Sequence, residues 1–225
     1  MFHYCRSLRL AWLALAFLPM GCNLSSLSYI LAGAPEPECP ADGMELTIPK
    51  DKKEMKVVVL AYSAMAAQAE FVTAERELSG LICRQLRQAC QLSDQKIVIV
   101  PPNKVQEFKN NNPDWHHMKL QDIGRRFGSD YVIFLDIESL SLYERGSSNQ
   151  LFRGRAEISV TLVNMHDADD DPLERHFSCA YPETRGPIPV DDQNAREFYM
   201  SFLNYMAKHI TWYFVPHATA DTVCE

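Results

Sequence analysis

Two short segments containing histidine or aspartate are the first candidates for metal chemistry. His116 and His117 are adjacent, so their side chains point apart, and a zinc site needs further ligands that converge on one point. The run His166–Pro172 places three aspartates at alternating positions, as a calcium-binding EF-hand loop does. Its sixth position is Pro172 where that loop requires glycine, and its twelfth is Ser178 where it requires glutamate. We therefore predict an exposed loop, a solvated turn and no metal site.

A histidine and a cysteine close together in sequence raise the question of a base and its nucleophile. His176 and Cys179 are three residues apart in a segment that alternates as a β-strand does. Their side chains should therefore point to opposite faces of that strand. The chain also lacks the GxxxxGK[ST], GxSxG and HExxH motifs. We expect neither a catalytic site nor a cofactor.

The amino-terminal residues have the pattern of an export signal. Met1–Arg9 is short and basic, and Leu10–Leu18 is an uninterrupted apolar run of nine residues that leads into Pro19-Met20-Gly21-Cys22. A bilayer-spanning helix needs about twenty apolar residues. The run is therefore typical of a signal-peptide core rather than of a transmembrane helix.

The end of this signal resembles a bacterial lipobox, in which small or apolar residues precede a cysteine. Gly21 matches the small residue before the cleavage point and Met20 fits the pattern, whereas Pro19 stands where leucine is usual. The resemblance implies that lipid is attached to the Cys22 thiol and that the chain is cut between Gly21 and Cys22. Acyl chains would then hold the protein on a membrane. The alternative is an ordinary signal peptide followed by an incidental cysteine.

Charge and cysteine content restrict what the exported chain can bind. The net charge of −7 falls to −9 once Arg6 and Arg9 leave with the signal, and no basic run is present. This composition disfavours binding to nucleic acid. The cysteines that remain besides Cys22 have no CxxC spacing; they are Cys39, Cys83, Cys90, Cys179 and Cys224. We expect buried thiols, with a bridge between Cys39 and Cys224 as the alternative.

Hydrophobic patterning divides the chain into four parts. Residues 1–21 are the signal peptide, 22–54 a proline-containing tether, 55–215 a single globular domain, and 216–225 a loose tail. Strands are expected at about 56–60, 96–100, 131–140, 152–163 and 173–181, and helices at about 72–91, 103–109, 119–127 and 193–214. The order βαβααβββα predicts a mixed α/β fold: a mixed sheet of about five strands with helices packed on it, ending in an antiparallel hairpin.

Local sequence also predicts where three helices begin or end. Asn103, with Gln106 three residues later, forms a capping-box pattern at the start of one helix. Asp191-Asp192 is expected to cap the last helix, where acidic residues suit the helix dipole. Gly128 is expected at the end of the helix near residue 127.

The element order and several local sequences resemble a family of periplasm-facing domains. The resemblance rests on the strand at 56–61, the segment Ile99–Val105, the segment Ile123–Ile133 and the opening of the hairpin at Phe152–Ala156. Similar patterns occur in the N-terminal domain of TolB and in the lipoproteins of curli secretion and penicillin-binding-protein activation, which have an anticodon-binding-domain-like fold. The resemblance covers roughly 56–214 and implies that fold, with varied partners and no shared catalytic site. Gly21–Tyr29 also resembles the start of lipoproteins found in planctomycetes.

The last expected helix is unusually rich in aromatic residues. They are Phe198, Tyr199, Phe202, Tyr205, Trp212, Tyr213 and Phe214. A wide core stripe accounts for Phe198, Phe202 and Tyr205. The favoured interpretation is that the core stripe includes all of these aromatic residues. Tyr199, Trp212 and Tyr213 are the candidates for a partner surface outside the stripe, since aromatic side chains exposed together often mark such contacts.

These observations lead to three hypotheses about function. The first is a lipid-anchored, non-catalytic binding or scaffold domain that faces the periplasm and docks on an envelope protein. The second is a subunit of an oligomeric secretion complex, and the third is an enzyme of unrecognised type. Asn23 follows the cysteine where some bacteria use aspartate to retain lipoproteins in the inner membrane, so the outer membrane is the expected location.

Overall fold

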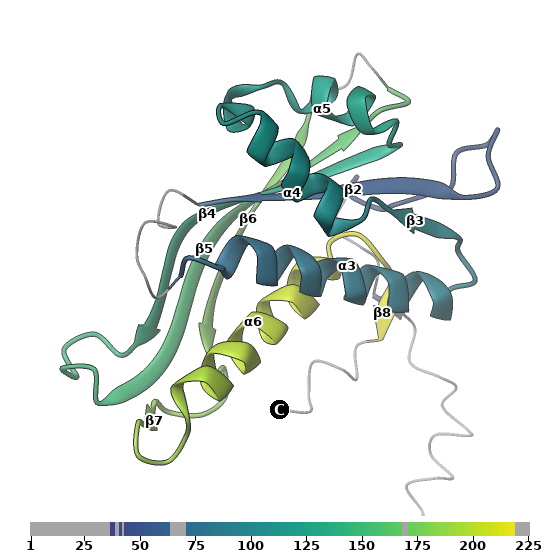
Figure 1. Ribbon diagram of the computed structural model, residues 1–225. Helices are drawn as coiled ribbons and strands as arrows, with labels where there is room; N and C mark the ends of the chain where they lie inside the picture. Colours follow the sequence, from purple (N-terminus) through teal and green to yellow (C-terminus); the bar gives the residue numbers. More distant parts are fainter. Residues whose placement is uncertain (1–36, 39–40, 42, 64–70, 168–170, 219–225) are drawn as a thin grey trace, which may run out of the picture.

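A six-stranded mixed sheet with four helices packed on it forms the centre of the computed structural model, which describes residues 37–38, 41, 43–63, 71–167 and 171–218 (Figure 1). The strands of this sheet are β2 (Met55–Tyr62), β3 (Ile97–Ile99), β4 (Tyr131–Tyr143), β5 (Leu151–Asn164), β6 (Leu173–Tyr181) and β7 (Ile188–Pro189). The helices are α3 (Ala74–Leu92), α4 (Pro102–Asn111), α5 (Leu120–Phe127) and α6 (Ala195–Thr211), with the short 3-10 helix η2 (Trp115–His117) between α4 and α5. The predicted fold class is confirmed, and β7 is the additional strand.

The sheet has a parallel half and an antiparallel half. β2 lies between β3 and β4 and is parallel to both, with Val57 opposite Ile99 on one side and Tyr131 on the other. Its central position explains why nearly all of its residues are buried. β4, β5 and β6 run antiparallel, and Ile158 of β5 lies opposite Phe177 of β6. The predicted hairpin is therefore confirmed.

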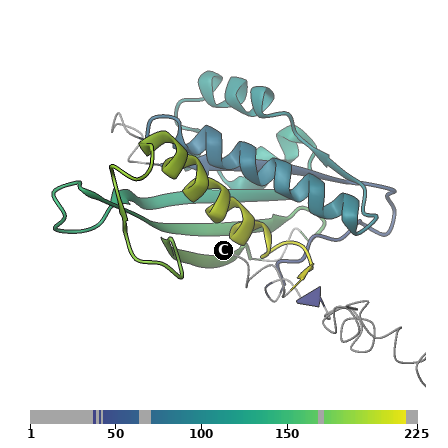
Figure 2. The same ribbon diagram turned by 90° about the horizontal axis from the view of Figure 1, so that it is seen from below.

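Helices cover both faces of the sheet and enclose two cores. α3 and α6 lie side by side on one face (Figure 2), and their apolar residues, Leu86 and Phe202 among them, pack in the larger core. α4, η2 and α5 enclose a smaller core around Trp115 and Ile123. The two crossover connections place their helices on opposite faces because β3 and β4 lie on opposite sides of β2.

The start of α4 differs from the prediction. The helix begins at Pro102, the preceding residue is Pro101, and neither Asn103 nor Gln106 forms the expected capping box. Proline suits the first turn because the N–H that it lacks would have no partner within the helix. The end of α5 is as predicted, with Gly128 in the left-handed conformation at φ 57°.

The start of α6 also differs from the prediction. Asn194 is the cap, and its side-chain oxygen accepts a hydrogen bond of 2.8 Å from the backbone N–H of Arg196. Asp191-Asp192, the predicted cap, lies in the turn before it. An amide side chain at the correct backbone position is a better cap than a carboxylate two residues too early.

The two ends of the described chain meet at one place. β1 (Pro37–Glu38) pairs antiparallel with β8 (His217–Ala218), so residues expected in the tail take part in a strand pair. Met44 and Leu46, which the sequence placed in the tether, are buried in the larger core. The folded part therefore begins before Met55.

Several predicted features lie outside the described residues. They are the signal peptide, its cleavage point at Gly21-Cys22, the lipid attachment at Cys22, and the bridge between Cys39 and Cys224. Within the described ranges, no helix is both long enough and apolar enough to cross a bilayer.

Asp130 ties the beginning of the domain to the sheet. Its carboxylate accepts hydrogen bonds from the Lys52 ammonium and from the backbone N–H of Lys56 (2.7 Å), and the Nε2 atom of His166 lies 2.7 Å away. The residue is 2% exposed. Burial acts to raise its pKa, but the hydrogen bonds outweigh burial and hold the pKa below its ordinary value.

Candidate functional site

The histidine pair lies in regular secondary structure, which the sequence did not predict. His116 and His117 lie in η2 rather than in an open loop, and the His116 ring stacks on Tyr62 with centroids 4.6 Å apart and planes 6° apart. His116 is half-buried, because this stacking holds it against the end of β2. In the part of the chain that the structure describes, no three His, Cys, Asp or Glu side chains are placed to hold a metal ion. The turn at 166–172 is described only in part, because residues 168–170 lie outside the described ranges.

The cysteines that the structure describes are not poised as nucleophiles. Cys179 packs against the larger core, whereas His176 is exposed on the other face of β6 and bonds to Glu157 at 2.7 Å. The two residues therefore point apart, as predicted. Burial raises the pKa of Cys179 to about 12 and that of Cys83 and Cys90 to about 11. These thiols stay protonated at neutral pH.

The three aromatic residues that were candidates for a partner surface do not share one environment. Tyr199 is 4% exposed and belongs to the larger core, so it lies in the core stripe and not on a partner surface. The stripe is wide because α6 packs on both the sheet and α3. Tyr213 is half-buried and packs edge-on against Phe177, with centroids 6.4 Å apart. Trp212 lines a concave surface.

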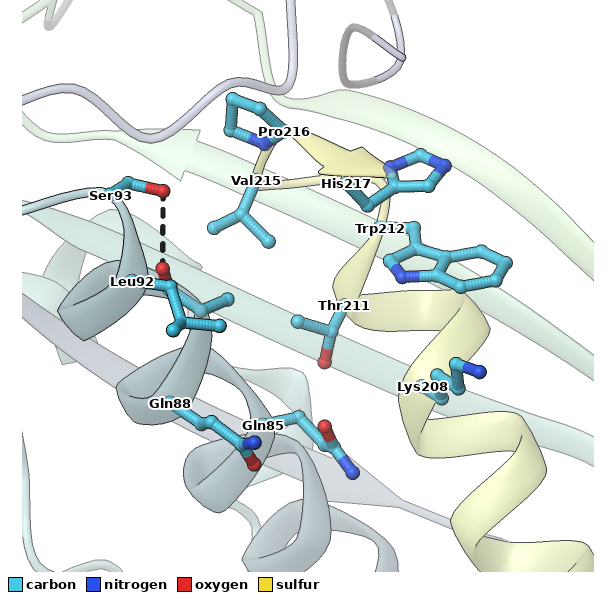
Figure 3. A pocket seen from close by; sticks show the side chains of 11 residues that line it. Gln85, Gln88, Leu92, Ser93, Lys208, Thr211, Trp212, Val215, Pro216 and His217 are labelled. Carbon is cyan, nitrogen blue, oxygen red and sulfur yellow. Dashed lines mark hydrogen bonds between the residues drawn. The ribbon is translucent and has the colours of Figure 1, made fainter. Parts of the chain in front are cut away.

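That concave surface, called the groove below, lies between the C-terminal ends of α3 and α6 (Figure 3). It has a volume of about 410 Å³, within the usual range for ligand sites. Its lining residues come from α3 and from the end of α6 with the segment that follows; they are Gln85, Gln88, Ala89, Leu92, Ser93, Lys208, Thr211, Trp212, Val215, Pro216 and His217. No carboxylate is among them, so an apolar ligand meets no buried negative charge there.

The rim of the groove carries an exposed apolar side chain and a half-buried aromatic one. Leu92 is 84% exposed, although its spacing from Ala89 on α3 would place it on the buried stripe. It is the last residue of α3 and so extends past the packed part of the helix. The Trp212 ring stacks on His217 with centroids 4.4 Å apart, and the Lys208 ammonium lies 5.2 Å from the Trp212 centroid. This packing holds the indole ring in a fixed orientation at the edge of the groove.

Thr211 supplies a polar group within this apolar surface. The residue is 3% exposed, and its hydroxyl has no hydrogen-bond partner. Figure 3 shows that hydroxyl directed across the groove toward Gln85 on α3. A buried hydroxyl without a partner carries a desolvation cost that a ligand can remove by forming a hydrogen bond. The groove therefore suits an apolar ligand that also carries a hydrogen-bonding group.

Comparisons with known proteins assign no family. No family model and no curated protein matches the chain. Similar solved structures include the PelC dodecamer from Paraburkholderia phytofirmans, at 10% identity, 81% coverage of this chain, 99% of that chain and a TM-score of 0.43. A DUF330 protein from Xanthomonas campestris is 11% identical, with coverages of 80% and 91% and a TM-score of 0.45. The lipoprotein GNA1162 from Neisseria meningitidis is 15% identical, with coverages of 68% and 98% and a TM-score of 0.38.

Likenesses at this level carry no argument about function. The resemblance to TolB and to the curli-secretion lipoproteins stays a prediction. Sequence patterns identified Trp212 as a candidate surface aromatic residue but gave no sign of Leu92 or Thr211. Neither belongs to a motif, and only the packing of α3 against α6 makes them neighbours.

Thr211→Val should make the protein more stable by about 1 kcal/mol, because an apolar methyl replaces a buried hydroxyl without a partner. Urea denaturation monitored by circular dichroism measures the change. Thr211→Ser is the control, since it keeps the hydroxyl and should give no gain. Equal stability of the valine variant and the wild type would show that the hydroxyl is satisfied.

Proposed function

We propose that this protein is a lipid-anchored envelope protein whose folded domain is a non-catalytic binding module, with the groove as its docking site. The ligand is an apolar segment of an envelope protein. The groove carries this proposal: it places the exposed Leu92, the fixed ring of Trp212 and the unpartnered hydroxyl of Thr211 around one apolar surface. In this proposal a large apolar side chain of the ligand packs against Leu92 and Trp212, and a backbone carbonyl of the ligand accepts a hydrogen bond from the Thr211 hydroxyl.

The anchor in this proposal is the lipid on Cys22, exposed after cleavage between Gly21 and Cys22, and the location is the outer membrane. The signal-like residues 1–21 and the lipobox-like residues before Cys22 support it. Intact-mass analysis of the membrane-bound chain tests the anchor. We expect a chain that begins at Cys22 and carries acyl mass, and a Cys22→Ala variant without that mass. A native chain without acyl groups would refute the anchor.

Site-specific photocrosslinking in intact cells tests the docking site. A photoreactive phenylalanine analogue at position 92 should give a defined crosslinked band, and Trp212→Ala in the same chain should weaken that band. Position 72 is the matched control, because Val72 is also an exposed apolar residue, 63% exposed, but lies just before the N-terminus of α3. The same band from both positions, or none from position 92, would count against the groove.

A further inference from the structure

The chain enters the domain next to the groove. In the β1–β8 pair, Glu38 lies opposite His217 and Pro37 lies opposite Ala218. His217 is also a wall of the groove, so the point where the tether joins the domain and the docking site share one residue. Figures 1 and 2 place β8 at the C-terminal ends of α3 and α6, and the turn between β4 and β5 at the opposite end of the domain.

The tether is short compared with the domain. Pro37 is the fifteenth residue after Cys22. Fully extended, this stretch would span about 50 Å, but as a random coil its mean extension is about 20 Å. α3, with 19 residues, is about 28 Å long, and β4, with 13 residues, is about 43 Å long. The mean extension of the tether is therefore shorter than the domain. At that extension the domain cannot point the end farthest from Pro37 at the membrane.

The chemistry of the two ends agrees with this orientation. The tether end carries the exposed Leu92 and the half-buried Trp212, with Lys208 beside the indole ring. Tryptophan and lysine are frequent where a protein meets the headgroup layer of a bilayer, because each combines an apolar body with a polar end. The turn at 144–150 instead consists of polar residues and glycine (Glu-Arg-Gly-Ser-Ser-Asn-Gln) and suits contact with water.

From this geometry we infer that the groove faces the bilayer, and that the segment it binds is the part of a partner protein next to that partner's own membrane anchor. This inference rests on the proposed function and names the partner class for the same site. Such a segment is apolar because it adjoins the membrane. Where this segment is not helical, its backbone carbonyls are free to accept a hydrogen bond from the Thr211 hydroxyl. Segments distant from the membrane are disfavoured because the groove lies at the end of the domain where the tether enters.

Quenching of tryptophan by brominated lipids tests the orientation. The lipidated chain is reconstituted in vesicles of phosphatidylethanolamine and phosphatidylglycerol with brominated acyl chains. The processed chain has two tryptophans, Trp212 at the groove and Trp115 in the smaller core. We expect the wild type to lose a large part of its emission. Trp212→Phe, which retains only Trp115, should lose little.

Equal fractional quenching of the wild type and of Trp212→Phe would overturn the orientation, as would failure of the chain to associate with the vesicles. Lengthening the tether with a Gly/Ser insertion after Ala34 should reduce quenching of Trp212. The position-92 crosslink adds a second readout: we expect mass spectrometry to map it to residues beside the partner's anchor, and a distant site would overturn the partner class. If Trp212 is not quenched but position 92 still gives a crosslink, only the orientation is refuted. If Trp212 is quenched but position 92 gives no crosslink, the proposed function is refuted.

Discussion

Asp130→Asn should destabilise the protein by about 2 kcal/mol, because at a buried site it replaces the carboxylate that accepts from the backbone N–H of Lys56, and it removes the charge partner of the partly exposed Lys52 ammonium. The aspartate joins residues before β2 to the start of β4 and to His166 after β5. Its loss therefore loosens three segments together. Urea denaturation at neutral pH measures the loss. Asp122→Asn is the control, since Asp122 pairs with Arg125 on the surface of α5 and should contribute little.

The effect of Asp130→Asn should depend on pH in one direction. The pKa of Asp130 is lower in the folded chain than in the unfolded chain, so its ionised form contributes stability above the unfolded value of about 3.9. That contribution is lost as the pH falls through the folded pKa. The stability difference between wild type and variant should therefore narrow below about pH 4. A difference that stays constant to the acid limit would mean that Asp130 acts through packing rather than charge.

Gly154→Val should destabilise the protein by about 3 kcal/mol, because there is no room for a side chain where α6 crosses β5. A Cβ atom at Gly154 would lie 2.7–2.8 Å from three ring atoms of Phe202. Phe202 is fully buried and stacks near Tyr181, so the ring has little space to move. Thermal unfolding followed by circular dichroism would show the loss.

Two further variants separate this clash from general effects of replacing glycine. Gly186→Val is the matched control, since a Cβ atom at Gly186 meets no atom within 4 Å. Its stability should stay close to that of the wild type. Combining Gly154→Val with Phe202→Ala should cost less than the sum of the two single changes, because the smaller side chain makes room for valine. If the two losses of stability simply add in the double variant, the valine acts on the strand and not on the Phe202 ring.

The fold could be predicted from sequence because burial in each strand follows a regular pattern. Val57–Leu60 is a continuous apolar run because β2 is covered on both faces, whereas β5 alternates because its second face is largely polar. Helix ends were harder to predict. The capping pattern at Asn103 was overridden by Pro101-Pro102, and Asn194 caps α6 because its backbone, rather than its charge, suits the position.

The candidate site could be predicted only in part. The sequence left it open whether Trp212 and Tyr199 lie in the core stripe or on a partner surface, because periodicity along one helix does not show how many neighbours that helix has. α6 packs against α3 as well as the sheet, and the second contact buries Tyr199. Leu92 and Thr211 gave no signal, since they come from two helices more than one hundred residues apart in sequence.

The sequence by itself determined the order of strands and helices, the mixed sheet and the expectation of an export signal with a lipid anchor, because each depends on local composition and periodicity. Only the tertiary structure decided that Met44 and Leu46 belong to the core, that β1 pairs with β8, and that the ends of α3 and α6 form a groove beside that pair. The physical reason is that these features depend on contacts between segments distant in sequence. Such contacts are fixed by how the amphipathic surfaces pack together, which no local pattern specifies.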